Sequence, residues 1–220
     1  MRQGEKSIEE LKEIEFLNQL LRHDLLNKIQ IAIGYLGIEG DDKKEKAMHI
    51  LHAASKDINN IRSIISSMGE PPEPINIDEI LEEVMRKYTP HAQENDIDIE
   101  YVPTGYTVMG NRLLDNVFSN LIEDSIKHSK SNIIDIYGWE DDGFYVISIE
   151  DNGIGIDDDL KEKIFNIGHR GKDSSGSGFG LYAVRRIVNG LGGKVTVDDS
   201  RKYPSGTVFD VYLMKPNSSK

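Results

Sequence analysis

The sequence predicts two parts of different fold class, a helical hairpin followed by an α+β sandwich in which helices cover one face of a sheet. The segment "MGEPPEPINID", from Met68 to Asp78, places three prolines within four residues, which ends a helix and stiffens a short linker. Before this segment apolar residues recur every three or four positions, and after it strand-like and helix-like segments are mixed. We therefore expect a hairpin over residues 1–70, a linker over 71–74 and a sandwich over 75–220.

Two heptad-like stripes predict the hairpin, and "GIEGDD" at residues 37–42 supplies the turn between them. The stripes are Ile14, Leu17, Leu21, Leu25, Ile29, Ala32 and Leu36, then Ala47, Leu51, Ala54, Ile58, Ile61, Ile65 and Met68. Two helices alone bury too little apolar surface to be stable. We therefore expect a homodimer that forms a four-helix bundle. Packing of the hairpin on the second part is the alternative.

The second part is expected to begin with a short strand near residues 75–77 and a helix that Asp78 caps and that ends near Tyr88. The pattern predicts strands at 97–103, 106–110, 132–140, 143–151, 193–199 and 206–214, and helices at 112–128 and 179–189. A glycine-rich irregular stretch at residues 152–178 precedes the last helix. The absence of a strict strand–helix–strand alternation favours an α+β sandwich over a parallel sheet.

Composition excludes several classes of function. The net charge of −12 argues against a basic surface for nucleic acid, and the absence of cysteine excludes disulfides and thiolate chemistry. The chain has no apolar run of about 18 residues and no signal-peptide pattern. We expect a cytoplasmic chain that makes no membrane contact itself, either alone or as one part of a larger membrane-bound protein.

Polar residues on two predicted elements, a strand end and a helix, have the chemistry of a nucleotide site. In "EDNGIGI", Asp151 ends a strand, where a carboxylate can accept a hydrogen bond from the amine of adenine, and Gly153 and Gly155 permit close backbone approach. In "NVFSNLIEDSIKHSK", Asn116, Asn120 and Asp124 recur every four residues on one helical face, and their oxygens suit Mg²⁺. An ordinary turn and an exposed polar stripe are the alternative interpretations.

A second glycine-rich segment, "GSGFGL", leads into a helix, and a helix N-terminus suits phosphate groups. Its candidate residues are Gly176, Gly178, Gly180 and Leu181. The preceding segment contains His169, Arg170 and Lys172, a basic cluster that suits a triphosphate if it covers the site. A solvated loop is the alternative.

The segment "LLRHDLLNKIQ" carries His23, Asp24 and Asn27 within the first predicted helix. His23 and Asn27 share one face, whereas Asp24 does not face His23 and would reach it only through its side chain. A neutral imidazole with a free lone pair is a nucleophile, and a nearby carboxylate can fix its tautomer. Taken alone, a histidine on an amphipathic helix is usually an ordinary surface residue, which is the alternative for His23.

In this order, the segments resemble the ATP-binding domain of sensor histidine kinases, within the superfamily of gyrase, heat-shock chaperone and mismatch-repair ATPases. "NLIEDSIKHS" resembles the asparagine box, "DNGIG" and "GSGFGL" the two glycine boxes, and "IF" at Phe165 the phenylalanine box. "HDLLN" resembles the phosphoacceptor box. The resemblance extends from about residue 13 to residue 213.

The resemblance implies that His23 is autophosphorylated, that Asp24 assists as acid or base, and that Asn27 aids this step and orients water in dephosphorylation. It implies that Asp151 binds the adenine amine and that the glycines shape the pocket and its lid. Asn120 and Lys127 would contact phosphates or Mg²⁺. His128 would line the pocket.

One residue departs from the family pattern, because Asp124 occupies a position where the family has a second asparagine. Aspartate still offers oxygen to Mg²⁺, but it adds negative charge beside a triphosphate. We expect ATP binding to persist and to depend strongly on Mg²⁺.

The resemblance implies a homodimeric kinase core that passes its phosphoryl group to an aspartate in the receiver domain of a response regulator, with phosphatase action as a compatible second activity. The alternatives are a nucleotide-binding scaffold with weak autokinase activity and a non-kinase ATPase of the same superfamily.

Overall fold

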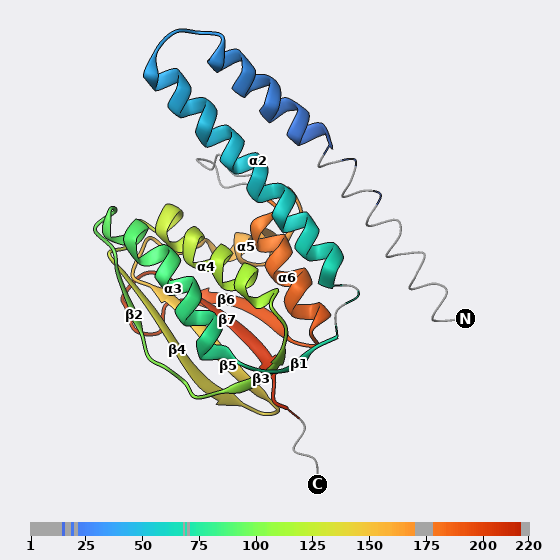
Figure 1. Cartoon of the computed structure of the whole chain (residues 1–220). Helices are drawn as coiled ribbons and strands as arrows, with labels where there is room; N and C mark the ends of the chain where they lie inside the picture. Colours follow the sequence, from blue (N-terminus) through green and yellow to red (C-terminus); the bar gives the residue numbers. More distant parts are fainter. Residues whose placement is uncertain are drawn as a thin grey trace.

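Two antiparallel helices form the N-terminal part of the chain in the computed structural model, which describes residues 15, 19, 22–67, 69, 71–169 and 178–216. Residues 22–36 are helical, and α2 spans Asp41–Ser67 (Figure 1). The predicted turn lies between them, where Gly40 adopts a φ of +134° that a side chain would strain. The predicted helical hairpin is therefore present.

The hairpin buries small residues between its helices and leaves large ones open. Ala32, Ala47 and Ala54 are buried. Ten large apolar side chains among the described hairpin residues remain exposed in the single chain: Leu26, Ile29, Ile31, Ile33, Leu36, Ile38, Met48, Leu51, Ile58 and Ile65. Four stripe residues, Ile14, Leu17, Leu21 and Met68, lie outside the described residues.

The C-terminal half of α2 packs on the rest of the chain, as the alternative arrangement anticipated. Ile61 and Ile64 are buried in the same core cluster as Phe118 and Phe179. Figure 1 shows α2 lying across α6 and beside α4. Docking on the second part and an open apolar stripe therefore coexist on one helix.

A five-stranded sheet forms the base of the second part. Its order is β2 (Asp98–Tyr101), β4 (Ile133–Asp141), β5 (Phe144–Asp151), β7 (Thr207–Met214) and β6 (Lys194–Asp199). Only the β2–β4 pair is parallel. A separate antiparallel pair joins β1 (Glu73–Asn76) to β3 (Thr107–Gly110).

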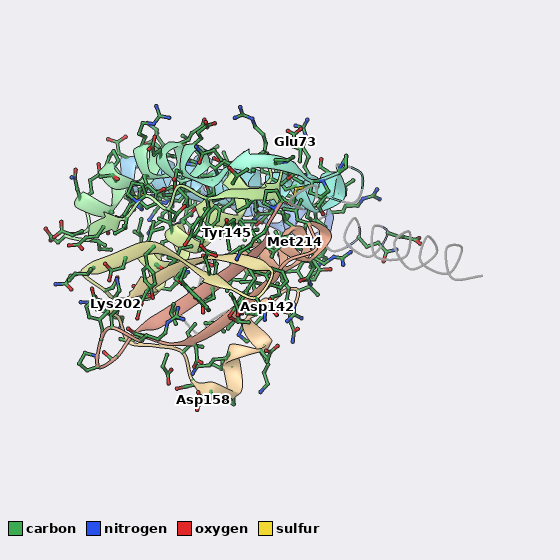
Figure 2. The ribbon with its side chains drawn as sticks, turned by 90° about the horizontal axis from the view of Figure 1, so that it is seen from below. Glu73, Asp142, Tyr145, Asp158, Lys202 and Met214 are labelled. Carbon is green, nitrogen blue, oxygen red and sulfur yellow. The ribbon has the colours of Figure 1, made fainter. Side chains whose placement is uncertain are left out.

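Helices cover one face of this sheet, which gives the predicted sandwich (Figure 1). They are α3 (Ile77–Gln93), α4 (Leu114–His128) and α6 (Gly180–Gly190). Phe118, Leu121 and Phe179 are fully buried between this layer and the sheet. The short helix α5 (Asp158–Lys161) and the 3-10 turn η1 (Lys163–Phe165) lie within the predicted irregular stretch. In Figure 2, Asp158 of α5 and Glu73 of β1 lie at opposite ends of this part.

The start and end of α3 differ from the sequence prediction. Asn76, rather than Asp78, caps the helix, because its side chain accepts a hydrogen bond from the Asp78 N–H at 3.0 Å. The Asp78 carboxylate instead accepts bonds from the backbone N–H groups of Thr104 and Gly105. The helix continues past Tyr88 to Gln93, since the buried Ala92 anchors its last turn.

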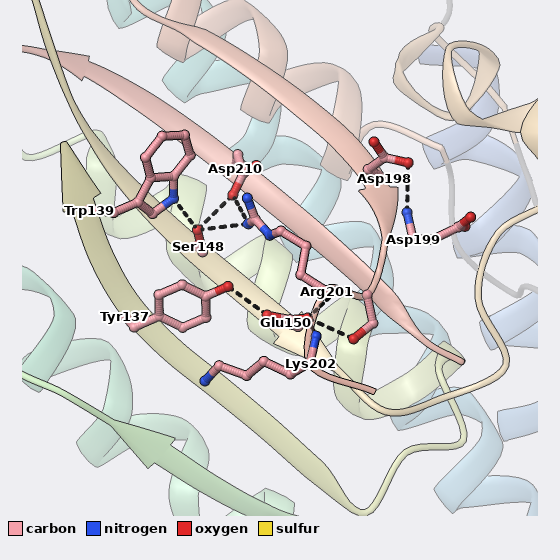
Figure 3. Close-up of polar contacts among 10 residues, drawn as sticks. Tyr137, Trp139, Ser148, Glu150, Asp198, Asp199, Arg201, Lys202 and Asp210 are labelled. Carbon is pink, nitrogen blue, oxygen red and sulfur yellow. Dashed lines mark hydrogen bonds and ion pairs between the residues drawn. The ribbon is translucent and has the colours of Figure 1, made fainter. Parts of the chain in front are cut away.

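Polar side chains cover the other face of the sheet (Figure 3). Ser148, which is fully buried, accepts a hydrogen bond from the Trp139 indole at 2.9 Å and donates one to Asp210 at 2.6 Å. Arg201 pairs with the same Asp210 carboxylate. Each buried polar group in this network therefore has a partner, as stability requires.

We expect the Asn76→Ala variant to lower the free energy of unfolding by about 1 kcal/mol, because the first turn of α3 loses its side-chain acceptor. In thermal unfolding this corresponds to a fall of about 2–4 °C in Tm. Asn76→Ser, which keeps a capping oxygen, is the control. An unchanged Tm in Asn76→Ala would show that the cap contributes nothing.

Candidate functional site

Helix α4 presents the predicted polar face, and the structure joins it to the hairpin. The Asn120 side chain is 1% exposed, and its Nδ2 donates to the Asn116 carbonyl at 2.9 Å and to Asn60 Oδ1 at 3.1 Å. Asn116 Nδ2 also donates to Asn60 Oδ1, at 3.3 Å. Asn60 belongs to α2, so three asparagines from two helices share one hydrogen-bonded cluster.

The first residue of α6 lies against this face. A Cβ placed on Gly180 would lie 3.1 Å from Asn120 Oδ1 and 4.0 Å from Asp124 Oδ2. Asn120 Oδ1 is buried and accepts no hydrogen bond from the described residues. The second glycine segment and the asparagine helix, distant in sequence, therefore meet around two side-chain oxygens.

These two oxygens are the candidate metal ligands. Within the described part of the chain, no three His, Asp or Glu side chains are grouped so as to hold a metal ion. A buried amide oxygen with an unused lone pair and a carboxylate fit Mg²⁺, which completes its shell with phosphate oxygens and water. Burial raises the pKa of Asp124, while the charges of Lys56 and His128 oppose that rise.

The end of β5 and the loop after it form the second side of the site. Asp151 is 2% exposed, and its Oδ1 accepts from the Gly153 N–H at 2.9 Å and the Thr207 N–H at 3.3 Å. Burial raises the pKa of Asp151, and these two N–H groups oppose the rise. A Cβ on Gly153 would lie 2.1 Å from the Ser129 carbonyl oxygen, so only glycine fits there.

The loop from β6 to β7 packs closely against the backbone of Asp151. A Cβ on Gly206 would lie 1.9 Å from the Asp151 carbonyl oxygen. The buried Glu150 holds this loop, because its carboxylate accepts from the Ser200 hydroxyl at 2.6 Å and the Lys202 N–H at 2.7 Å (Figure 3). The network on the outer face of the sheet therefore fixes the loop that contacts Asp151.

The segment between the two glycine boxes is described at both ends. Gly168 N–H donates to the Gly178 carbonyl at 3.3 Å, which joins the ends. Phe165 is buried and packs edge-to-face on Phe209 at 6.3 Å between ring centroids. His169 and Leu181 are half-buried. Arg170, Lys172 and Gly176 lie outside the described residues, and Gly155 adopts a φ of +76° in the first glycine box.

Two predicted residues lie at the C-terminal end of α4. Lys127 is exposed and pairs with Glu123 one turn earlier, and Glu123 also pairs with Lys56 of α2 at 2.9 Å. His128 is exposed and lies one turn after Asp124. Lys127 is thus held by a carboxylate of its own helix.

The phosphoacceptor segment lies on the first hairpin helix, where His23 and Asn27 are both exposed. Asp24 is half-buried and pairs with Lys28 at 3.4 Å, and Lys28 also pairs with the buried Asp57 of α2. The structure therefore ties Asp24 into an ion-pair network across the hairpin. His23 stays accessible to a second protein or domain.

Sequence reasoning missed three α2 residues, namely Lys56 and Asn60, which contact α4 at the site, and Asp57, which pairs with Lys28 on the first helix. One signal was available, since Asp57 and Asn60 share a helical face with Ile61 and Ile64. Polar residues on an apolar face indicate specific partners. Gly206, also missed, precedes the last strand.

Two segments of the sequence match known protein families. Residues 110–217 match the histidine kinase-, DNA gyrase B- and HSP90-like ATPases, and residues 3–68 match the α-helical domain of SpoOB-type sensor kinases. The class defined by fold and site is thus a nucleotide-binding domain joined to a sensor-kinase helical domain.

Relatives carry the same combination. The methanogenesis regulatory histidine kinase FilI of Methanothrix harundinacea is 28% identical over 206 residues, which cover 84% of this chain and 23% of that protein. The sensor histidine kinase DpiB of Escherichia coli is 34% identical over 117 residues, covering 51% and 20%. The chain therefore spans about a quarter or less of the length of these relatives.

Solved structures share the fold. Histidine kinase ThkA in complex with the response regulator TrrA has a TM-score of 0.75 at 21% identity, covering all of this chain and 67% of that one. Acinetobacter baumannii histidine kinase AdeS has a TM-score of 0.69 at 18% identity, covering 89% and 98%. By its two family matches and these relatives, the chain belongs to the family of sensor histidine kinase catalytic cores. None of the helices described here has the length and apolar character needed to span a bilayer.

Gly153→Ala should abolish nucleotide binding or lower the affinity by at least about tenfold, because the added methyl group cannot coexist with the Ser129 carbonyl. Equilibrium dialysis with a labelled ATP analogue measures this. Gly34→Ala, on the hairpin with open space around its Cα, is the matched control and should bind normally. Normal binding by Gly153→Ala would refute the close packing.

The contact between α2 and α4 should depend on pH. Burial of Glu123 opposes its ionisation, but Lys56 and Lys127 prevail and lower its pKa from 4.5 to about 2. Because the pKa of Glu123 is lower in the folded than in the unfolded state, its ionisation stabilises the fold at pH values above 4.5. This stabilisation is lost as pH falls from 4.5 toward about 2. We expect wild type to exceed Glu123→Gln in Tm near neutral pH and the difference to shrink below about pH 4.5. A constant difference would contradict this assignment.

Proposed function

We propose that the chain is the core of an ATP-dependent protein histidine kinase that phosphorylates His23 and passes the phosphoryl group to an aspartate of a response regulator. The observation that carries this proposal is that the side-chain oxygens of Asn120 and Asp124 lie beside Gly180 at the start of α6. The same chain exposes His23 on its helical hairpin. The proposed assignment rests on geometry and on the two family matches together.

In this proposal, Asp151 recognises the adenine base. Its Oδ1 accepts two backbone N–H groups, so the carboxylate is held in one orientation at the end of β5. An oxygen in that position accepts a hydrogen bond from the adenine amine, whereas guanine offers a carbonyl there. Gly153 and Gly155 leave room for the base to approach the backbone.

The phosphates are expected at the start of α6, where Gly178 and Gly180 precede a helix with free N–H groups. Asn120 and Asp124 would hold Mg²⁺, which neutralises charge on the phosphates when bound. Arg170, Lys172 and Gly176 are proposed to cover them. Lys127 and His128 lie at the far end of α4, and contacts from them to the nucleotide are proposals as well.

In the phosphoryl transfer, the lone pair of one His23 ring nitrogen forms the N–P bond. The bond from the γ-phosphorus to the bridging oxygen breaks, and ADP leaves with that electron pair. The other ring nitrogen gives up its proton to a base, for which Asp24 is the nearest carboxylate in sequence. Asp24 pairs with Lys28 at 3.4 Å, and Asn27 shares the face of His23.

The hairpin is proposed to form a homodimer. Ten exposed large apolar side chains on two short helices exceed what an isolated surface usually presents. A second copy would bury them in a four-helix bundle. The two exposed His23 residues of this bundle, one from each copy, would then be open to a receiver domain in the cytoplasm.

A second candidate function follows from Asp124. A half-buried aspartate beside a triphosphate adds a charge that weakens nucleotide binding, and this favours a scaffold with weak autokinase activity. Phosphatase action on the regulator is compatible with either candidate.

Incubation with γ-labelled ATP and Mg²⁺ tests the kinase directly. We expect acid-labile, base-stable label on wild type and none on His23→Gln, because an N–P bond hydrolyses in acid and survives base, whereas a phosphate ester survives acid. His49→Gln changes an exposed histidine of α2 and should label like wild type. Nucleotide binding without label supports the scaffold, and phosphate release without label supports a plain ATPase.

A further inference from the structure

Two residues of α2, one helical turn apart, oppose α4 at the proposed metal site. Lys56 pairs with Glu123 at 2.9 Å, and Asn60 accepts from Asn120 at 3.1 Å and Asn116 at 3.3 Å. Asn60 is 2% exposed although it lies on a helix of the hairpin. The hairpin thus contributes a buried polar group next to a candidate metal ligand.

The orientation of the Asn120 amide follows from these contacts. A backbone carbonyl only accepts hydrogen bonds, so the atom 2.9 Å from the Asn116 carbonyl is the nitrogen of Asn120. Asn120 Oδ1 must therefore point the other way, toward Gly180, where it has no hydrogen-bond donor among the described residues. That direction is the one a metal ligand needs.

Asn60 makes the opposite orientation costly. If the Asn120 amide flipped, its oxygen would face three acceptors, namely Asn60 Oδ1, the Asn116 carbonyl and Asn116 Oδ1. Two of these belong to α4 and move with Asn120. Among the residues that the structure describes, Asn60 is the only contributor from another element, and it also holds Asn116 through the same oxygen.

We propose that Asn60 is a positioning residue for Asn120, through which the hairpin helix orients a Mg²⁺ ligand of the nucleotide site. The proposal rests on the proposed function of that site. Docking of α2 on α4 and binding of the metal–nucleotide complex then support each other, because coupling between two binding events is reciprocal. A hairpin that undocks would leave the nucleotide site with a poorly oriented ligand.

The test compares the affinity of the full chain for a non-hydrolysable ATP analogue in Mg²⁺ and in EDTA. Loss of a residue that orients a metal ligand typically weakens metal binding by about 10–100-fold. We expect Asn60→Ala to weaken Mg²⁺-dependent binding by at least about tenfold and to leave binding in EDTA unchanged. Mn²⁺ binding in the presence of the analogue, followed by electron paramagnetic resonance, gives a second readout independent of activity.

Two variants separate positioning from folding and from a general effect of substitution on α2. Asn60→Asp keeps an acceptor for both amides, so its Mg²⁺-dependent affinity should stay within about threefold of wild type. Asn59→Ala makes the same change at the exposed neighbouring position of α2, outside the amide cluster, and its affinity should stay within about twofold. If Asn60→Ala does not fold, Asn60→Asp still tests the proposal by keeping the acceptor.

Three outcomes overturn the proposal. Tighter binding by Asn60→Ala shows that α2 blocks the site, and equal weakening in Mg²⁺ and EDTA shows a structural role only. A large loss in Asn60→Asp shows that an acceptor at this position is not what matters. Failure of wild type to bind nucleotide in Mg²⁺ instead refutes the proposed function itself, so the two failures are distinguishable.

Discussion

The site depends on one constraint, which is that a buried amide must satisfy its two N–H groups and still leave an oxygen open. Asn120 meets it by donating to Asn116 and Asn60 while its Oδ1 faces Gly180. An unsatisfied buried N–H costs about 1–3 kcal/mol, so the cluster fixes both the rotamer and the position of α2. Helix α6 then starts where that oxygen points.

The parts of this arrangement that sequence could predict are local. The glycine pattern after the strand indicated a close backbone approach at Gly153, and the structure shows such a contact with the Ser129 carbonyl. The helical period placed Asn120 and Asp124 on one face. The hairpin and the sandwich followed from apolar spacing and the proline segment. The cap of α3 was misassigned because Asn76 and Asp78 are both good capping residues, and only the geometry shows which side chain accepts.

The rest could not be predicted because it joins residues far apart in the chain. Asn60 and Asn120 are separated by 60 positions, and an asparagine in a helix gives no indication of which distant amide it meets. In the sequence, Glu150 likewise cannot be distinguished from an ordinary strand residue. In the structure its carboxylate accepts hydrogen bonds from Ser200 and Lys202 in the loop that contacts Asp151. Both are buried polar residues whose partners depend on how separate elements pack.

The same helix can serve the intrachain contact and a dimer because the two use different faces. Asp57, Asn60, Ile61 and Ile64 are buried against the first helix, α4 and α6, whereas Leu51, Ile58 and Ile65 recur every seven residues and stay exposed. A second copy that covers the exposed stripe need not disturb Asn60. A dimer contact and the orientation of Asn120 therefore use separate faces of α2, and α2 is the element through which a change in the bundle would reach the nucleotide site.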